Sequence, residues 1–497
     1  DPTIVRSGAA YVGGINRKPS HPNNGPPRPS LFPMGAYSRL WAVLLGILSL
    51  LEASCALNYS FPYGSEKIRG VSLAGWLVID QWMTPSLFAH TNSSVIDEWT
   101  FCQYQDRQTA ARALEKHWKT FITEADFAAI AAAGLNHVKI PIGYWAFDVV
   151  DGEPYVQGQL PYLMKAVSWA EVHGLKVIID LFGAPGSQNG YLSIRSAPPS
   201  IFYQSMSSPR FQGRHIWTNS TRTVRLAICI RLPLSTQNSF FQSTWQDSQS
   251  NIDRTNAIIK RLASMFARHT NVVPVIVPLN EPKTIYNEKI QSVTKQFYYD
   301  SYGNIRYPYG TSQSSNLVVM ISVGFQSVDF WDNFMPPPKW EGVLLETRYY
   351  QIWTDADNAL SYTQHIENIC KAKSTLSGSL WTVVGEWTTA STDCANGING
   401  RYVGSRYDGT YPGSARVSSC TGLTGNASTF NEGYKTFLRQ FWEAQVQTYE
   451  AGSQGWLQWV WKAENADDWS YQAGLANGWI PRNPTDYKYP NICQPEA

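Results

Sequence analysis

Two glutamates stand directly after apolar runs and could form a catalytic pair. Glu281 lies in Asn280-Glu281-Pro282, and Glu386 lies in Gly385-Glu386-Trp387. Carboxylates are rarely placed against a core unless they are paired or used, although each one alone could be a structural hydrogen-bond partner. Hydrolysis of a glycosidic bond requires two positioned carboxyl groups, one to protonate the leaving oxygen and one to attack the anomeric carbon. The pair therefore predicts glycosidic bond cleavage.

Eight apolar, β-rich runs alternate with helical stretches along the chain. Most are continuous in Val, Ile and Leu instead of alternating with polar residues, as expected for parallel strands covered by helices. The runs are Gly70–Val78, His137–Ile142, Lys176–Leu181, Val272–Leu279, Asn316–Val323, Gly342–Gln351, Leu380–Trp387 and Gly455–Trp461.

Helices are expected between these runs. Thr123–Ala133 begins with an N-cap residue followed by acidic residues and ends before Gly134, and Pro161–His173 and Asn251–His269 have similar patterns. The alternation predicts an α/β fold, a (β/α)8 TIM barrel with a single catalytic domain. In such a barrel the reacting groups lie at the carboxyl ends of the strands, where Glu281 and Glu386 follow the fourth and seventh runs.

The first 56 residues have the pattern of a precursor. Residues 1–33 are rich in Pro, Gly and Asn and are expected to be disordered or translated upstream of a start at Met34. Residues 34–56 resemble a signal peptide, with an apolar run at Leu40–Leu51 that is short for a membrane span and small residues before Leu57. The alternative is a signal anchor, but Glu52 truncates the apolar run. We therefore expect cleavage after Ala56, no stable membrane span thereafter, and a catalytic domain over residues 57–497.

The cysteines and sequons agree with an oxidising compartment. Four cysteines lie in the last third of the chain and could form two disulfides, for which three pairings are open: Cys370, Cys394, Cys420 and Cys493. Four N-x-S/T sequons occur, at Asn58, Asn92, Asn219 and Asn426. We expect a protein that is secreted to the extracellular space or the cell wall.

Composition excludes some partners and leaves one question open. The formal net charge is +2, which gives no electrostatic reason to expect nucleic acid as a partner. No cysteine or histidine spacing resembles a zinc site, and no Gly-rich phosphate fingerprint follows the first run. The 20 Trp and 27 Tyr residues fit either a large core or a cleft in which flat rings stack on sugars.

One stretch, residues 191–243, breaks the alternation. It mixes Pro, Ser, Arg and Phe, contains the lone Cys229, and is long for a barrel loop. It could be a lid over the site. A disordered insertion or a translated intron is favoured, because nothing in it shows a packing pattern.

Ordered motifs across residues 61–493 resemble the family 5 glycoside hydrolases, and among them the fungal exo-β-1,3-glucanases. The motifs are RGVSLAGW (69–76), HWKTFITEADF (117–127), GLNHVKIPIGYWAF (134–147), GAPGSQNG (183–190), NEP (280–282), GEW (385–387) and GWLQWVWKAENADDWSY (455–471). NEP or GEW alone is a weak signal, but the ordered set is specific.

The resemblance implies roles for individual residues. It makes Glu281 the acid/base and Glu386 the nucleophile of a retaining double displacement. Asn280 would hydrogen-bond the sugar 2-hydroxyl, and Tyr350 would contact the nucleophile. Asp80 occupies a position where the family carries a glutamate that binds the terminal glucose.

The resemblance also implies an aromatic frame and a disulfide pattern. Trp461 would form the platform under the sugar, while Tyr191 and Trp353 would clamp it at the pocket mouth. Ordinary packing is the alternative for these aromatic residues. The implied disulfides pair Cys370 with Cys493 and Cys394 with Cys420.

Three positions that would line the site depart from the family. Lys139 replaces an arginine and loses its bidentate fork. Phe182 replaces a histidine and cannot hydrogen-bond the sugar. Arg348 replaces another histidine and adds a permanent charge near Tyr350. Lys139 and Arg348, both expected among the substrate-binding residues, would keep positive charge near Glu386 and so keep the nucleophile ionised.

The expected function is a secreted retaining β-glucan hydrolase that releases glucose from the non-reducing ends of β-1,3-glucan. It would need no metal or organic cofactor, and we expect a monomer. One alternative is a β-1,6-glucanase or another β-glucosidase, favoured by Phe182 and Arg348. Another is a catalytically impaired cell-wall protein that binds glucan without turnover.

Overall fold

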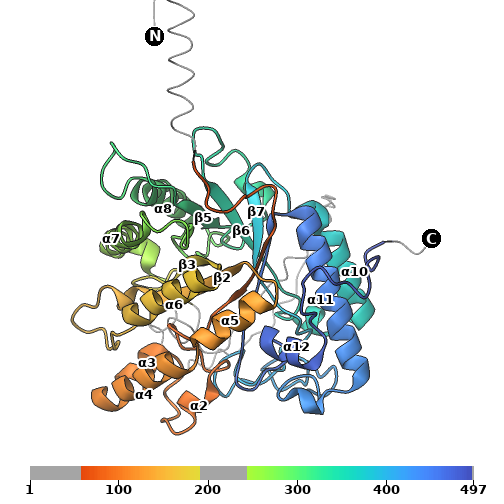
Figure 1. The fold of residues 1–497 in the computed structure, drawn as a ribbon. Coiled ribbons are helices and arrows are strands. Elements are labelled where there is room, and N and C mark those ends of the chain that lie inside the picture. The colour runs from red at the N-terminus through yellow and green to blue at the C-terminus, as the bar shows by residue number, and fades with distance from the viewer. Residues whose placement is uncertain (1–56, 191–242, 495–497) are drawn as a thin grey trace, which may run out of the picture. The chain divides into compact units, whose positions relative to one another are not determined.

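The protein's computed structural model describes residues 57–190 and 243–494 (Figure 1). The predictions for residues 1–56, for nearly all of the 191–243 stretch, and for Tyr191 and Asn219 within it lie outside these residues.

Eight parallel strands close into a barrel in chain order, each paired with its sequence neighbours and β8 with β1 (Figure 1). This confirms the predicted (β/α)8 barrel. The strands are β1 (Ile68–Ser72), β2 (His137–Gly143), β3 (Lys176–Gly183), β4 (Val275–Val277), β5 (Val318–Ser322), β6 (Val343–Tyr349), β7 (Trp381–Trp387) and β8 (Gly455–Gln458).

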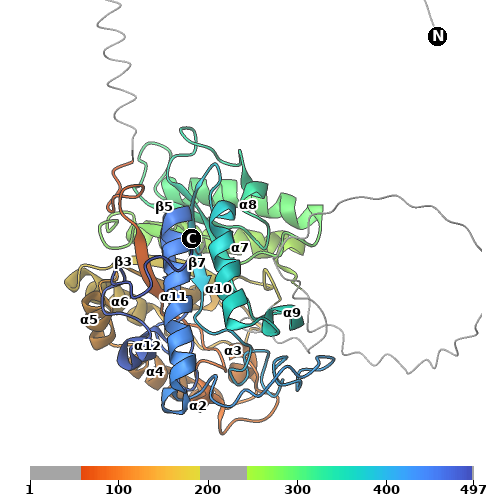
Figure 2. The same cartoon turned by 90° about the vertical axis from the view of Figure 1, so that its right-hand side faces the viewer.

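Helices surround the strands. Figures 1 and 2 show α10 and α11 side by side, on the opposite side of the strands from α7 and α8. The bounds are α2 (Pro85–Phe88), α3 (Glu98–Gln103), α4 (Arg107–Thr120), α5 (Glu124–Ala132), α6 (Leu160–Val172), α7 (Gln249–Phe266), α8 (Glu288–Arg306), α9 (Asp355–Asn358), α10 (Tyr362–Lys371), α11 (Glu432–Gly452) and α12 (Tyr471–Asn477).

The three helices expected from sequence are present with ends shifted by a few residues. Thr123 begins α5 through a capping box in which its backbone N–H donates to Asp126 at 2.8 Å. The strand–helix alternation is incomplete in one place, since β5 and β6 are joined by a described connection whose only helical part is the 3-10 turn Asp329–Trp331.

The barrel interior is layered, because successive side chains of a strand point to opposite faces. Ile178 of β3 and Leu344 of β6 belong to an apolar cluster inside the barrel, whereas their neighbours Ile179 and Leu345 pack outward against the helices. Two residues beyond Ile178 and Leu344, the same inward face carries Asp180 and Glu346. The interior therefore changes from apolar to charged toward the carboxyl ends of the strands.

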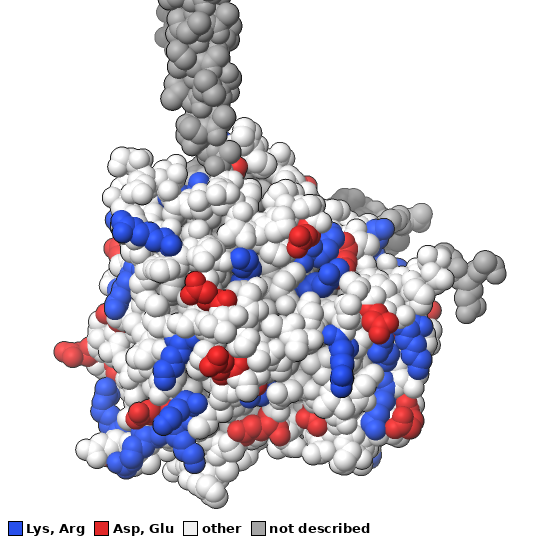
Figure 3. Space-filling view, viewed as in Figure 1, with Lys and Arg blue, Asp and Glu red and all other residues white. Residues whose placement is uncertain are grey.

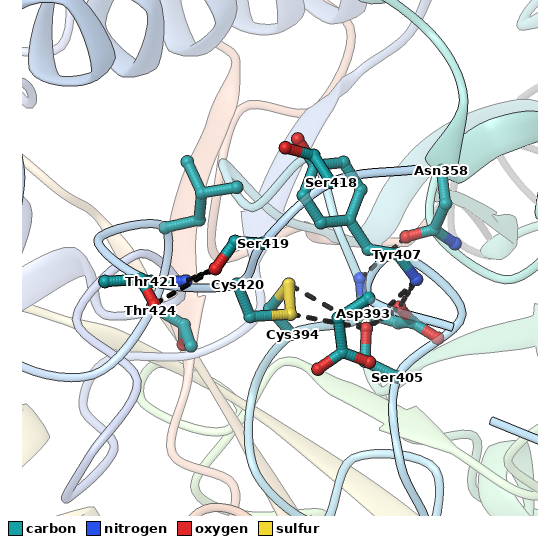
Figure 4. The surroundings of a disulfide bond; sticks show 12 residues. Asn358, Asp393, Cys394, Ser405, Tyr407, Ser418, Ser419, Cys420, Thr421 and Thr424 are labelled. Atoms are coloured by element: carbon teal, nitrogen blue, oxygen red, sulfur yellow. Dashed lines mark hydrogen bonds between the residues drawn. A yellow bond between two sulfur atoms is a disulfide. The ribbon is translucent and has the colours of Figure 1, made fainter. Parts of the chain in front are cut away.

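Two disulfides secure the last third of the chain and confirm the pairing that the resemblance implied. Cys370 of α10 is bonded to Cys493, and Cys394 to Cys420. Figure 4 shows the second disulfide beside Asp393, whose carboxylate accepts hydrogen bonds from the Ser405 hydroxyl at 2.6 Å and the Tyr407 backbone at 3.2 Å. The β7–α11 connection is therefore held by both a covalent bond and a buried carboxylate.

Charges of both signs are interspersed on the face shown in Figure 3, with no large region of one sign. Within residues 57–190 and 243–494, no helix is both long and apolar enough to cross a membrane.

Candidate active site

Glu281 lies in a sharp turn just past the end of β4. Its φ of 49° is in the left-handed region, which residues with a Cβ rarely adopt and which costs about 1–3 kcal/mol. The backbone carbonyl of Asn280 accepts a hydrogen bond from Gln188 at 2.6 Å, which helps to hold the turn. The side chain of Glu281 is 18% exposed, so it is the more accessible of the two catalytic candidates.

Glu386 lies near the end of β7 and meets three donors. Its Oε1 is 3.3 Å from Lys139 Nζ and 3.1 Å from Arg348 Nε, and its Oε2 accepts a hydrogen bond from the Tyr350 hydroxyl at 3.2 Å. Two cations and a phenol therefore contact this one buried carboxylate. The contact expected between Tyr350 and the nucleophile candidate is therefore present.

Arg348 bridges the two glutamates. Its Nε is 3.0 Å from Glu281 Oε1 as well as 3.1 Å from Glu386 Oε1. Its guanidinium also donates to Ser322 Oγ at 2.9 Å and to the Asn280 side-chain oxygen. Four carboxylates raise the pKa of Arg348 above its usual range against the opposing effect of burial, so the bridge is permanently charged.

The surroundings of Glu281 suit a group that donates a proton. Burial raises the pKa of Glu281 to about 7; the charge of Arg348 opposes this and that of Glu386 adds to it. A carboxyl group with such a pKa is protonated in mildly acidic solution and can donate its proton. A neighbouring ionised carboxylate next to a protonated one is the arrangement that acid-plus-nucleophile chemistry requires.

Asn280 is buried between the glutamates and has one unused donor. Its Oδ1 accepts from Arg348, whereas its Nδ2 meets no acceptor within the part of the chain that the structure describes. A buried amide N–H without a partner is costly, so it is suited to donate to a bound hydroxyl. This is compatible with the sugar contact expected for Asn280.

Lys139 does not lie where a substrate-binding residue would, and this corrects the expectation for it. It is fully buried, with Nζ 2.6 Å from Glu346, 3.1 Å from Asp180 and 3.3 Å from Glu386. Burial would lower its pKa, but these three carboxylates raise it above the usual range. Lys139 therefore contacts Glu386 from the barrel interior, where three carboxylates enclose its ammonium group.

Sequence reasoning missed Asp180 and Glu346. Both lie within continuous apolar strand runs, and both are fully buried on the inward face of their strands. The signal that could have found them is a charged residue on the inward, two-residue period of its strand: Asp180 follows Ile178 on β3, and Glu346 precedes Arg348 on β6.

An aromatic cluster adjoins Glu386 through Tyr350. Phe182 stacks on Trp459 with ring centroids 5.6 Å apart, and Trp353 packs edge-on to Tyr350 at 5.9 Å. All four belong to one apolar cluster together with Trp82. Trp353 is half-buried in this cluster, and Phe182 contributes a ring that forms no hydrogen bond.

Trp461 requires a second correction. It is only 1% exposed, and its indole N–H donates to Asp126 of α5 at 2.9 Å, which places the ring in the packing between barrel and helix. Trp459, two residues earlier, is the tryptophan of this segment that stacks on Phe182. Trp459 and Trp461 are separated by one residue in the sequence. Their packing shows that Trp459 faces the aromatic cluster and Trp461 faces α5.

Asp80 lies in the long loop after β1 and is hydrogen-bonded to the neighbouring Trp82 of the aromatic cluster. Burial raises the pKa of Asp80 to about 6, which the hydrogen bonds from Trp82 partly oppose. It therefore adjoins the site through Trp82.

No group of three or more metal-ligating side chains with suitable geometry occurs among the described residues. Glu386 is contacted by the cationic side chains of Lys139 and Arg348.

Comparisons with known proteins identify relatives of this chain. No protein-family model matches the chain. A probable glucan 1,3-beta-glucosidase A of Aspergillus niger is 37% identical over 458 residues, covering 90% of this chain and 97% of that protein. The glucan 1,3-beta-glucosidases of Blumeria graminis and Candida oleophila are 36% and 33% identical, covering 95% and 93% of those proteins.

Solved structures share the fold. A rutinosidase from Aspergillus niger matches with a TM-score of 0.60 at 16% identity, covering 85% of this chain and 100% of that one. The structure named AoRut matches with a TM-score of 0.59 at 17% identity. The identities to the curated relatives, over nearly their whole length, are high enough to establish common descent: the chain belongs to the family of glucan 1,3-beta-glucosidases, which are glycoside hydrolases.

Proposed function

We propose that this protein is a retaining β-glucan hydrolase that releases glucose from the non-reducing ends of β-1,3-glucan, with Glu281 as acid/base and Glu386 as nucleophile. The observation that carries the proposal is the bridge at Arg348, whose Nε lies 3.0 Å from one glutamate and 3.1 Å from the other.

The bridge limits the separation of the carboxyl groups. The two Oε1 atoms are no farther apart than the sum of those two distances, which is below the ~6.5 Å at which the range for inverting enzymes begins. Retaining enzymes hold their carboxyl groups at roughly 5–5.5 Å, because no water has to fit between nucleophile and anomeric carbon. The spacing therefore favours a double displacement.

In the first step Glu281 protonates the glycosidic oxygen while ionised Glu386 attacks the anomeric carbon and forms a covalent ester. Esterification removes the negative charge of Glu386, which had raised the pKa of Glu281, and leaves the opposing charge of Arg348. The pKa of Glu281 then falls, so its carboxylate can accept a proton from the water that cleaves the ester. Glucose leaves with its β-configuration retained.

The test is glucose release from a short β-1,3-linked glucan by the parent protein and by Glu386→Gln, with the anomeric configuration followed by NMR. We expect the parent to release β-glucose first and the variant, which has no nucleophilic carboxylate, to release none. Release of α-glucose would refute the double displacement. If both proteins bind the glucan and neither releases glucose, the protein binds glucan without turnover.

A different linkage is the second candidate, and Phe182 and Arg348 favour it. Phe182 stacks on Trp459 where a hydrogen-bonding side chain would contact a sugar hydroxyl, and Arg348 occupies the space between the glutamates. Both change the shape and polarity of the pocket floor. A panel of β-linked glucose disaccharides distinguishes the candidates: the first requires the β-1,3 disaccharide to have the highest kcat/KM, the second the β-1,6 or another isomer.

We also propose that the protein is secreted and acts outside the cell or in the cell wall as a monomer. Two disulfides support an oxidising compartment, and the three sequons that the structure describes, at Asn58, Asn92 and Asn426, are exposed. Detection of the glycosylated protein in culture medium, with its mass in solution measured by light scattering, tests both statements.

A further inference from the structure

A buried carboxylate that has no access to substrate lies below the proposed nucleophile. Glu346 of β6 is fully buried, with Oε1 2.6 Å from Lys139 Nζ and Oε2 3.3 Å from Arg348 Nη2. Those two cations are the same two that contact Glu386 Oε1. Glu346 therefore holds, from the opposite side, both positive charges that stabilise the nucleophile.

The backbone next to the nucleophile leaves room for this carboxylate. Gly385 immediately precedes Glu386, and a Cβ at this position would lie 2.0 Å from Glu346 Oε1. No heavy atom fits at that distance, so any larger residue at 385 would displace the Glu346 side chain. A glycine is needed here because two strands bring a backbone and a carboxylate into direct contact.

The two ion pairs of Glu346 favour its ionised form. The titratable groups around it are Lys139 from β2, Asp180 from β3, Arg348 from β6 and, on the same two cations, Glu386 from β7. The charge of Glu346 also reaches Glu281 after β4 and Tyr298 of α8. Burial raises the pKa of Asp180 to about 7 against the effect of Lys139. Burial would also raise that of Glu346, but Lys139 and Arg348 hold its pKa below the usual value.

We propose that Glu346 is a positioning residue for the reaction: it fixes Lys139 and Arg348 against Glu386 and so sets both the orientation of the nucleophile and the charge that the acid/base experiences. This inference rests on the proposed function, since it gives Glu346 its role through Glu386 and Glu281. Glu346 touches no substrate, because it is enclosed by the strands and by the two cations.

The test compares Glu346→Gln with Glu346→Asp in the full chain, by the pH profile of kcat/KM and by kcat on the glucan that the parent hydrolyses. Glu346→Gln keeps the size but removes the charge. We expect its kcat to fall by up to about a hundredfold with KM unchanged, because the two cations are no longer held in place. The alkaline limb of its kcat/KM profile should move to lower pH, because the charge of Glu346 helps to raise the pKa of Glu281.

Glu346→Asp keeps the charge on a shorter side chain, so its alkaline limb should stay at the parent's pH and its kcat should lie between those of the other two proteins. This variant also keeps the test decisive if Glu346→Gln fails to fold. The matched control is Glu443→Gln on α11, because Glu443 is equally buried and paired with Arg439 but lies away from the site. The control should melt at a lower temperature, with kcat and the limb unchanged.

The outcomes separate the two proposals. An active parent with a folded Glu346→Gln whose kcat and alkaline limb equal the parent's overturns the positioning role and leaves the proposed function standing. An equal shift of the alkaline limb of the pH profile in Glu443→Gln also overturns the positioning role. A parent that cleaves no β-glucoside overturns the proposed function, and the positioning role with it.

Discussion

At the scale of single residues, the proposed mechanism requires Glu281 to carry a proton while Glu386 attacks as a carboxylate. Arg348 contacts both groups, so it stabilises the anionic form of each. Burial nonetheless outweighs this effect at Glu281 and raises its pKa to about 7. The surroundings of the two glutamates differ, since Lys139 and Tyr350 add direct contacts to Glu386 at 3.3 and 3.2 Å.

The pH dependence of the rate follows from this difference. Glu281 is an effective acid below its pKa and loses its proton above it, so we predict that kcat/KM for glucan falls as the pH rises through about 7. Glu281→Gln should lower kcat on glucan by about 10²–10⁴-fold, because no group then protonates the leaving oxygen.

A dinitrophenyl β-glucoside provides the control for that variant. Its leaving group departs without protonation, so Glu281→Gln should release a fast burst of dinitrophenolate whose rate has no alkaline limb, followed by slow ester hydrolysis. Glu386→Gln should show no burst. Equal losses of Glu281→Gln on both substrates would contradict the role of Glu281 as acid.

At the scale of elements, the loop after β8 has two tryptophans with different tasks. Trp461 and Lys462 donate to the carboxylate of Asp126 at 2.9 and 2.8 Å, which ties this loop to the first turn of α5. Trp459 faces the opposite way and stacks on Phe182 of β3. One residue thus secures the barrel to a helix, and the other borders the site.

We predict that Trp461→Phe lowers the free energy of unfolding by about 1–3 kcal/mol, because a buried carboxylate loses one of its donors, and leaves KM unchanged. Trp459→Ala should instead raise KM, because it removes an aromatic face from the cluster that meets Glu386 through Tyr350. Chemical denaturation and steady-state kinetics on both variants check this pair. A raised KM in Trp461→Phe with normal stability would restore Trp461 as the sugar platform.

At the scale of the whole molecule, the two disulfides close loops of very different length. Cys370 and Cys493 are 123 residues apart in sequence, and Cys394 and Cys420 are 26 apart. In the chain-entropy description, closure of a longer loop removes more entropy from the unfolded chain. The Cys370–Cys493 bridge also attaches the end of the chain to α10.

We predict that replacing Cys370 and Cys493 together by serine lowers the free energy of unfolding by about 2–5 kcal/mol, and by about 1 kcal/mol more than the same replacement at Cys394 and Cys420. Unfolding in denaturant of the two double variants and the parent measures both differences. A larger loss for the shorter loop would show that local contacts, such as those around Asp393, outweigh loop entropy.

Much of the fold was predictable because its signals are local. Each strand is a short apolar run bounded by polar or turn residues. Of the expected helices, α5 and α7 begin at capping residues and α6 carries a proline in its first turn, so neighbouring residues alone indicate their positions. The exception is the β5–β6 connection. The alternation of strands and helices along the rest of the chain predicted a helix there, and the structure has only a 3-10 turn.

The catalytic candidates were predictable for the same reason, but their partners were not. Glu281 and Glu386 follow apolar runs directly, which marks them as polar groups at strand ends. Lys139 was expected among substrate-binding residues, yet it is enclosed by three carboxylates. Nothing near Lys139 in the sequence indicates those partners, since they come from β3, β6 and β7.

By itself, the sequence indicated the strands, a parallel barrel and the two glutamates at strand ends, because the apolar runs are local patterns and their alternation with helices repeats along the chain. Only the tertiary structure decided that Glu346 meets Lys139 across 207 residues of chain, that Arg348 joins Glu281 to Glu386, and that Trp459 instead of Trp461 borders the site. The physical reason is that closure of the barrel sets which side chains face one another across its interior. That register belongs to all eight strands together, and no single segment of the sequence contains it.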